Sequence, residues 1–588
     1  MVAIPFILLL YISSLAICNG DVIVETSTGR VSGIQVKSIL ENEKYYSFMG
    51  IPYAEPPVGE LRFMPPFPHN GWSDILSVKK EKNSCAQNRM PIRGAKNFGY
   101  CGSEDCLYLS IHTPTLPHED DDVNLPVIVF LHNEQFRMSS NNSIDYGPDF
   151  FMNEEVILVT VNHRLGALGF LSFEDDLLPG NNGIRDVIVA LYWIKVNINK
   201  FGGDPNKITL MGYDGGAVIV DILLHTPKVR GLFVAAILQS GNLWNSLNIV
   251  DKRKERAIEL SEKLDENVFT SSNLLKRLNT KSSLDITVAE ESCVHADESR
   301  AIQVGILPFG PIVEHEHSGA VFTKIPEAPF DINVPVMIGY NSREGIEVTE
   351  RYLHKPQYLT FADRDFLFLF PIKTNYHFDI HSSVYYDAIQ EVKDFYFDEG
   401  YIKVSKPGEF VTYIGDVMSF YPIDYGVRKY INGSNVPVYY YMFDYSGELN
   451  KRKNDVLSKS KSIDGTWGAT MGDDLCYLFV CKSIKKIYKK AIQDDDSEDM
   501  KIVNTMVKMW TNFAKTGNPT PPGEQFVWKP ASKNEKNCLV INEELQMKSN
   551  VHQETVDFWD NFLQKYEAKA IDGVVTDNKN NTKNKDEL

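Results

Sequence analysis

The sequence lacks an excess of basic residues. Its 588 residues include 60 Lys and Arg against 78 Asp and Glu, which gives a formal net charge of −18 and a pI of about 5.3. A basic surface able to neutralise phosphates is therefore not expected, and nucleic acid and anionic membrane surfaces are excluded as partners on this ground. Hydrophobic residues make up 43% of the chain, so disordered and fibrous proteins are excluded as well.

Long hydrophobic runs are missing beyond the N-terminus. Residues 4–17 form a short apolar run, and the small residues Ala16, Cys18 and Gly20 stand at its end. A membrane anchor needs about 20 apolar residues, which this run does not reach. Although no Lys or Arg precedes the run, we predict that residues 1–20 are a cleaved secretory signal peptide. No transmembrane segment is expected in the rest of the chain.

The C-terminus carries a predicted localisation signal. Its last four residues are Lys585, Asp586, Glu587 and Leu588, the tetrapeptide that the endoplasmic reticulum (ER) retrieval receptor reads at a free C-terminus. We predict that residues 566–588 form a flexible polar tail presenting it. Together with the signal peptide, this tail predicts a resident of the ER lumen within the secretory pathway, with the retrieval receptor as a partner.

Cysteine is scarce and its number is odd after signal cleavage. Of eight Cys, Cys18 leaves with the signal, so at least one of the remaining seven cannot pair within the chain. The compartment favours disulfides, and Cys85 with Cys106 is the best candidate pair. Cys476 and Cys481 stand close together in an apolar stretch, and we predict that they are buried free thiols.

Glycosylation sequons occur in three places. Asn141 and Asn432 lie in polar, turn-like surroundings, and we expect glycans there; a third sequon stands at Asn580 in the tail. Asn518 is not expected to be glycosylated, because Pro519 follows it directly.

Apolar β-branched runs alternate with helical patterns along the body of the chain. This alternation predicts a large, mostly parallel central sheet flanked by helices, in one domain over residues 21–565. Turn residues at 202–205 separate one predicted helix from the next strand, as a crossover connection requires. The predicted strands are 127–131, 156–161, 207–211, 334–339 and 436–443, and the predicted helices are 186–199 and 502–513.

Several motifs make the sequence recognisable. It resembles the type-B carboxylesterase and cholinesterase family, most of all its insect members, and this resemblance implies an α/β-hydrolase fold. It also supports the Cys85–Cys106 pair as the family's first disulfide. The matching segments span nearly the whole mature chain: GIPYAEPPVG at 50–59, SEDCLYL at 103–109, NHRLG at 162–166, GGDP at 202–205, QSG at 239–241 and WTNFAKTGNP at 510–519.

The catalytic motifs of that family are altered here. The family's chemistry needs a Ser in a Gly-x-Ser-x-Gly elbow, a His base and an acid. The elbow reads GYDGG at 212–216, so Asp214 holds the nucleophile position. Glu344 matches the acid, while Met471 stands where the His belongs, and a thioether cannot shuttle a proton. We interpret Glu344 as a buried, hydrogen-bonded relic that supports its loop.

The loop that forms the family's oxyanion hole has also lost its glycines. After His132 the chain has Asn133, Glu134 and Gln135, and the other donor position, after the elbow residue, is Gly215. Side chains are expected to crowd this loop, and Glu134 would bring negative charge to a site that should stabilise it.

Two expectations concern Asp214 itself. At the start of a helix its carboxylate should stay ionised and, with Glu134, make the site acidic and repel anionic ligands. The alternative is that Asp214 only caps the helix.

The main prediction is therefore a non-catalytic carboxylesterase-like protein of the ER lumen, which binds a protein or a hydrophobic small molecule in the former active site. Members of the family without the triad act as adhesion or interaction proteins, which supports this hypothesis by analogy only. The alternative is a carboxylic ester hydrolase, or a hydrolase with Asp as nucleophile as in dehalogenases and epoxide hydrolases, that uses non-standard groups; such an enzyme still needs a base, which another His would have to supply. A third possibility is a chain without function. No metal or cofactor is expected.

Overall fold

The computed structural model describes residues 21–40, 43–89, 99–117, 123–139, 145–294 and 296–577. The predicted signal peptide, Asn141, Asn580 and the C-terminal tetrapeptide at 585–588 lie outside these described residues.

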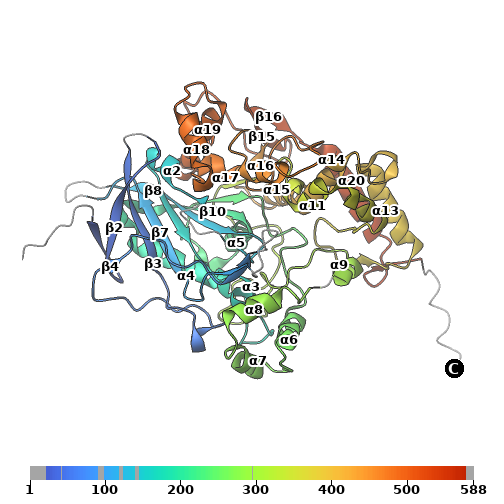
Figure 1. The fold of residues 1–588 in the computed structure, drawn as a ribbon, viewed down its shortest axis with the longest axis horizontal. Helices are drawn as coiled ribbons and strands as arrows, with labels where there is room; N and C mark the ends of the chain where they lie inside the picture. The colour runs from blue at the N-terminus through green and yellow to red at the C-terminus, as the bar shows by residue number, and fades with distance from the viewer. Residues whose placement is uncertain are drawn as a thin grey trace, which may run out of the picture.

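A large mixed sheet runs through the described part of the molecule (Figure 1). It has thirteen strands, in the order β1-β2-β3-β7-β9-β8-β10-β11-β12-β14-β15-β16 with β4 beside β2. The strands from β9 to β15 are parallel, and antiparallel strands extend both edges. Their bounds are β1 Asp21–Thr26, β2 Gly29–Lys37, β3 Lys44–Pro52, β4 Leu76–Ser77, β7 Tyr108–Thr113, β8 Leu125–Asn133, β9 Ile157–Val161, β10 Gly203–Asp214, β11 Ala235–Gln239, β12 Val336–Asn341, β14 Val438–Phe443, β15 Asn537–Ile541 and β16 Gln546–Ser549.

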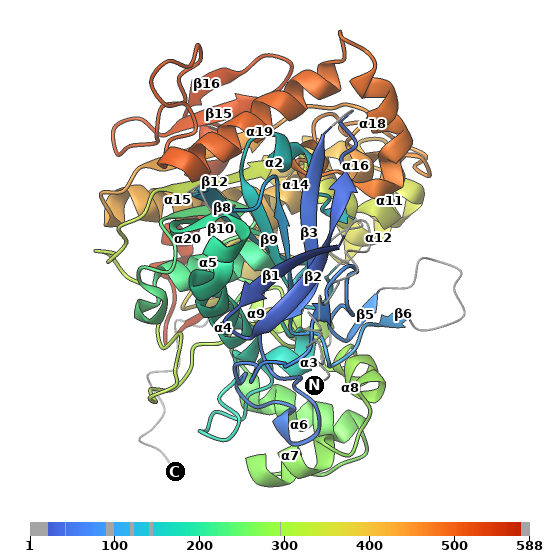
Figure 2. The same cartoon turned by 90° about the vertical axis from the view of Figure 1, so that its left-hand side faces the viewer.

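Helices cover both faces of the sheet, as a parallel sheet requires (Figure 2). The described helices are α2 Asp149–Asn153, α3 Gly166–Phe170, α4 Asn182–Asn197, α5 Gly215–Leu224, α6 Arg253–Lys263, α7 Ser271–Leu278, α8 Ser283–Glu290, α9 Ala296–Ile302, α10 Gly345–Val348, α11 Glu350–His354, α12 Leu359–Arg364, α13 Ser383–Tyr396, α14 Pro407–Gly415, α15 Tyr421–Gly433, α16 Lys451–Leu457, α17 Leu475–Leu478, α18 Lys485–Ile492, α19 Glu498–Thr516 and α20 Gln553–Glu567. Two small ladders lie outside the sheet: β5 Gln87–Arg89 with β6 Gly99–Cys101, and β13 His377–Phe378 with β17 Val574–Val575.

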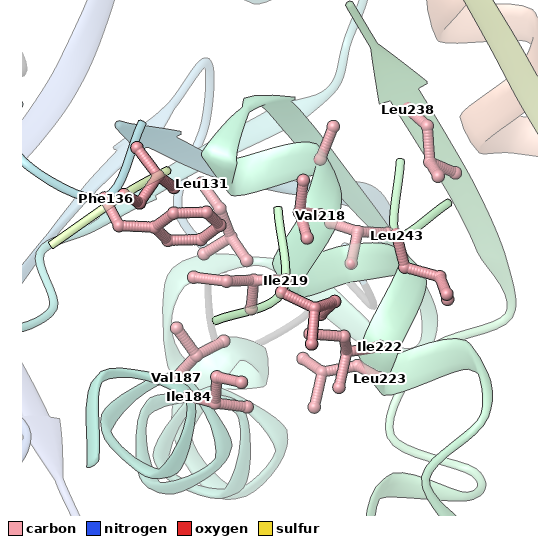
Figure 3. Packing of buried hydrophobic residues seen from close by; sticks show 14 of the residues in the cluster. Leu131, Phe136, Ile184, Val187, Val218, Ile219, Ile222, Leu223, Leu238 and Leu243 are labelled. Atoms are coloured by element: carbon pink, nitrogen blue, oxygen red, sulfur yellow. The ribbon is translucent and has the colours of Figure 1, made fainter. Parts of the chain in front are cut away.

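Successive side chains of a strand point to opposite faces of the sheet, and this alternation divides the buried residues between two hydrophobic cores. Along β8, Val129 and Leu131 belong to the core shared with α4 and α5, whereas Ile128 and Phe130 belong to the core shared with α2 and α19. Figure 3 shows α5 packed between the sheet and α4, with Ile219 among the side chains that fill the gap. This packing fixes α5, the helix that begins at the carboxyl end of β10, against the sheet.

The sequence predictions for the body of the fold are confirmed. The predicted strands correspond to β8, β9, β10, β12 and β14, and the predicted helices to α4 and α19. The strand β10 begins earlier than expected, because Gly203 already pairs with Leu125.

The folded part extends past residue 565, where the domain was expected to end. The helix α20 continues to Glu567, Val574 and Val575 pair with β13, and the Asp577 carboxylate accepts a hydrogen bond from the backbone N–H of Ser383. The first part of the predicted flexible tail is therefore ordered against the domain. Among the described helices, none is both long and apolar enough to cross a bilayer.

Candidate active site

The chain turns sharply between β10 and α5, and Asp214 occupies the corner. Its φ of 49° and ψ of −117° lie in a region that non-glycine residues rarely adopt. The surrounding backbone is very close: a Cβ at Gly212 would lie 2.4 Å from the carbonyl oxygen of Gly216, and one at Gly216 would lie 2.2 Å from that of Leu131. The turn thus has the backbone shape of the predicted nucleophile elbow, with a carboxyl group at its corner.

The Asp214 side chain does not cap α5. Its Oδ2 accepts a hydrogen bond from the Gln135 backbone N–H at 3.2 Å, and no side-chain bond reaches the first turn of the helix. Burial raises the pKa of Asp214 well above its usual range, and the charge of Glu134 raises it further. The expectation of a helix cap is therefore wrong, and loss of water opposes ionisation of the carboxyl group more than one backbone donor favours it.

Side chains crowd the loop after β8, as expected, and its N–H groups are all engaged. Asn133 Oδ1 accepts the Phe136 N–H at 2.8 Å, and Glu134 N–H donates to the Met138 carbonyl at 2.7 Å. With the Gln135 N–H on Asp214, no donor of residues 134–136 is left for an incoming oxyanion. Asn133 Oδ1 would lie 1.9 Å from a Cβ at Gly215, so any larger residue there would require the Asn133 side chain to move.

The Glu134 charge is partly compensated by Arg452, but it still raises the pKa of Asp214. Arg452 Nη2 donates a hydrogen bond to the Glu134 carboxylate, and Arg452 Nη1 lies 3.2 Å from Glu347 Oε2. The same guanidinium lies 5.4 Å from the centre of the Tyr213 ring. Arg452 therefore ties the oxyanion-hole loop to α16 and neutralises part of the negative charge beside Asp214.

Glu344 is buried and hydrogen-bonded on one side only. Its Oε1 accepts the Ser240 hydroxyl at 2.6 Å and the Asn341 backbone N–H at 2.9 Å. Its Oε2 is buried and has no hydrogen-bond partner among the described residues. Burial raises the pKa of Glu344, and interactions with Asn341, Ser240 and the nearby Ser419 hydroxyl partly offset this effect. Glu344 is thus buried and hydrogen-bonded, as predicted, and its Oε2 makes no hydrogen bond of regular geometry among the described residues.

A small cavity brings the candidate groups together. It has a volume of about 20 Å³, room for about one water molecule, and its wall includes Asp214, Ser240 and Met471. Leu247 lines this cavity and also an adjoining one of about 330 Å³. The structure therefore places the elbow residue and the Met at the family's His position on one cavity, as expected.

No histidine lines this cavity in the described part of the chain. His132 is buried against Tyr146, and its Nδ1 hydrogen-bonds Ser139 at 2.9 Å. His163 Nε2 lies 3.2 Å from the Asn133 amide and thus contacts the loop, not the cavity. Among the described residues, no group of three or more His, Cys, Asp and Glu is placed to hold a metal.

Two groups important to the site were missed from the sequence. Ser240 belongs to the QSG segment, which served only to support the family resemblance; its position directly after a parallel strand next to β10 was the available signal. Arg452 carries no sequence signal, because it lies 318 residues from Glu134.

The cysteines confirm one prediction and correct another. The Cys85–Cys106 disulfide is present, and so is a Cys476–Cys481 disulfide, where free thiols were predicted. The latter prediction was wrong because the chain around α17 turns back and brings the two Cα atoms within 5.6 Å. Asn432 is exposed in the last turn of α15, so its sequon is accessible.

Comparison with known proteins gives a consistent result. The Carboxylesterase family matches residues 20–559. Esterase FE4 of Myzus persicae is 30% identical over 87% of this chain and 87% of its own length, and the juvenile hormone esterase of Tribolium castaneum is 31% identical over 85% and 84%. The crystal structure of juvenile hormone esterase from Manduca sexta shares the fold, with a TM-score of 0.72 at 24% identity, covering 92% of this chain and all of that one.

These findings overturn the main prediction of a non-catalytic binding protein. The relatives that match most of the chain are named esterases, and the backbone of the elbow is retained. The alternative, an ester hydrolase with non-standard groups, fits them better. The α/β-hydrolase fold and the family resemblance are confirmed: the chain belongs to the carboxylesterase family.

Proposed function

We propose that the protein hydrolyses carboxylic esters at the cavity shared by Asp214, Ser240 and Met471. The observation that carries this proposal is the retained elbow: a strained turn at the carboxyl edge of the sheet, in a chain similar to named esterases over most of its length. Maintaining such backbone strain costs on the order of 1–3 kcal/mol and is typical of active sites.

Asp214 is assigned the role of a proton-carrying donor. Its raised pKa keeps the carboxyl group protonated to a higher pH than an exposed Asp. A protonated carboxyl in an apolar site can donate a hydrogen bond to a developing oxyanion. This role compensates for the N–H groups of the loop, which are engaged elsewhere.

The adjoining cavity favours an uncharged substrate with an apolar arm. Its wall includes Val250, Ile302 and Leu307, and the ionic groups at its rim are already paired: Lys373 with Asp251 and Lys252 with Glu298. Leu247 lines both cavities, so an ester bound across them would contact its side chain. Flexible Met418 and Met471 side chains make the small cavity adaptable.

The test is hydrolysis of uncharged aryl esters of increasing acyl length by the purified protein. We expect turnover above background that co-elutes with the protein and falls on Asp214→Ala by about 10²–10³-fold, as for loss of one oxyanion donor. Turnover unchanged in Asp214→Ala would indicate a contaminant or another site, and no turnover with any ester would refute the proposal.

We also propose that the enzyme is retained in the ER lumen by its C-terminal tetrapeptide, with the retrieval receptor as its partner. Deletion of Lys585–Leu588 should release the protein into the culture medium, with a glycan at Asn432. Efficient secretion of the intact chain would contradict this proposal, whatever its activity.

A further inference from the structure

A second strained turn lies beside the elbow. Ser240 follows β11, the parallel neighbour of β10, and has a φ of 54°. The two turns touch: a Cβ at Gly241 would lie 2.4 Å from the carbonyl oxygen of Asp214. A positive φ is uncommon for serine, and the turn directs this serine to the wall of the same small cavity.

Ser240 has what the elbow residue lacks, namely a base within reach. Its hydroxyl donates to Glu344 Oε1 at 2.6 Å, and it accepts a bond from the Asn341 side-chain amide at 3.2 Å. A nucleophilic hydroxyl requires a base at about 2.6–3.2 Å, held in turn by a third group. The Asn341 backbone N–H holds the carboxylate in place.

We propose that Ser240 is the nucleophile and Glu344 the general base of this enzyme. The inference rests on the proposed ester hydrolysis and supplies the groups that perform it. In active members of the family these two tasks fall to other positions, matched here by Asp214 and Met471.

The step balances without an added co-reactant other than water. Ser240 Oγ attacks the ester carbonyl carbon as Glu344 Oε1 takes the hydroxyl proton, and the carbonyl electron pair moves to oxygen next to the Asp214 carboxyl. The C–O bond to the alcohol then breaks, and Glu344 returns the proton to the departing oxygen. Water attacks the acyl-Ser240 in the same way, Glu344 accepting its proton and giving it to Ser240 as the acid leaves.

A serine bonded to a buried carboxylate is not by itself a catalytic site, and the chain contains a matched example. Ser110 in β7 donates to Glu81 at 2.9 Å, Ser110 is buried and Glu81 half-buried, and burial raises the pKa of Glu81 as it does that of Glu344. Ser110 lies in the middle of a regular strand and does not line the small cavity. The strained turn and the shared cavity are what distinguish Ser240.

Covalent labelling tests the assignment directly. The full-length protein is treated with an uncharged alkyl fluorophosphonate, which reacts with activated serines, and the labelled peptide is mapped by mass spectrometry. We expect the label on Ser240, its loss in Ser240→Ala, and labelling slowed by about 10²–10⁴-fold in Glu344→Gln. Ser110→Ala is the control and should leave the label unchanged. Ser240→Cys, alkylated by iodoacetamide, serves if the alanine variant does not fold.

The outcomes separate this inference from the proposed function. Ester turnover without a label on Ser240, and surviving in Ser240→Ala, overturns the serine assignment and leaves the hydrolase. A label on Ser240 without any ester turnover supports the assignment and refutes the hydrolase. A label on another serine, or equal labelling in Glu344→Gln, overturns the pair.

Discussion

The turns after β10 and β11 are alike in backbone and opposite in chemistry. Each ends a parallel strand, each holds a non-glycine residue at positive φ, and each leads into glycine. Asp214 meets a backbone N–H and has no base, whereas Ser240 meets a carboxylate at 2.6 Å. The difference teaches that an α/β sheet edge offers neighbouring positions for a reactive group, so an altered elbow does not by itself remove the means of catalysis.

The largest effect expected from this comparison is on Ser240. Ser240→Ala should lower kcat by roughly 10⁴-fold or to background, because no covalent step remains, whereas Asp214→Ala should cost only about 10²–10³-fold. Steady-state kinetics on one aryl ester, with folding checked by circular dichroism, compare the two. A greater loss from Asp214→Ala would reverse the assignment of the two turns.

The two turns should also control opposite sides of the pH profile. Glu344 must be deprotonated to act as a base, so activity should rise as pH increases through its raised pKa. Asp214 must be protonated to donate, so activity should fall as pH increases through its own, more strongly raised pKa. The resulting bell should lose its alkaline limb in Asp214→Asn, with kcat reduced by about tenfold or less because the amide still donates. Because the two carboxyl groups interact, the limbs report values of the pair.

Much of the fold followed from local pattern. Apolar runs and turn glycines located β8, β9, β10, β12, β14 and the elbow, since buried parallel strands read as continuous hydrophobic segments. The Ser240–Glu344 and Glu134–Arg452 pairs did not follow, because they join segments 104 and 318 residues apart in the sequence. The Cys476–Cys481 disulfide was missed for a related reason, because an apolar stretch favours burial but does not indicate how the chain turns within it.

A smaller effect should come from Glu290, a buried residue next to the segment that holds the oxyanion-hole loop beside the elbow. Its Oε2 accepts the Ala167 N–H at 2.8 Å at the start of α3, and the neighbouring Gly166 N–H binds the Phe136 carbonyl of the oxyanion-hole loop. Burial raises the pKa of Glu290 to about 7. The folded state then holds a proton that the unfolded chain loses near pH 4.5, so stability should decline by up to about 3 kcal/mol between pH 4.5 and 7.

Urea unfolding at pH 4.5, 6 and 8 measures this decline. Glu290→Gln keeps an acceptor for Ala167 and carries no charge, so it should flatten the decline relative to wild type. Glu291→Gln, at the next position and paired with Arg137, should flatten the decline much less, because the charge of Glu291 is a smaller cause of the raised pKa of Glu290 than burial is. An identical slope in wild type and Glu290→Gln would show that the group does not titrate in this window.

The smallest expected effect is that of Arg452 on the two turns. Its guanidinium lowers the pKa of Asp214 and compensates Glu134, but it is not close enough to Ser240 to bond it. In Arg452→Gln the unpaired Glu134 charge should raise the pKa of Asp214 further, so the alkaline limb moves to higher pH while the acid limb stays in place. Because the pair is partly exposed to solvent, the loss of stability should be only about 1 kcal/mol. Lys451→Gln, which removes an exposed pair with Asp455 on the same helix, is the control and should move neither limb. A shift of the acid limb instead would mean that the charge of Glu134 acts mainly on Glu344. The roles assigned to Asp214 and Glu344 would then have to be revised.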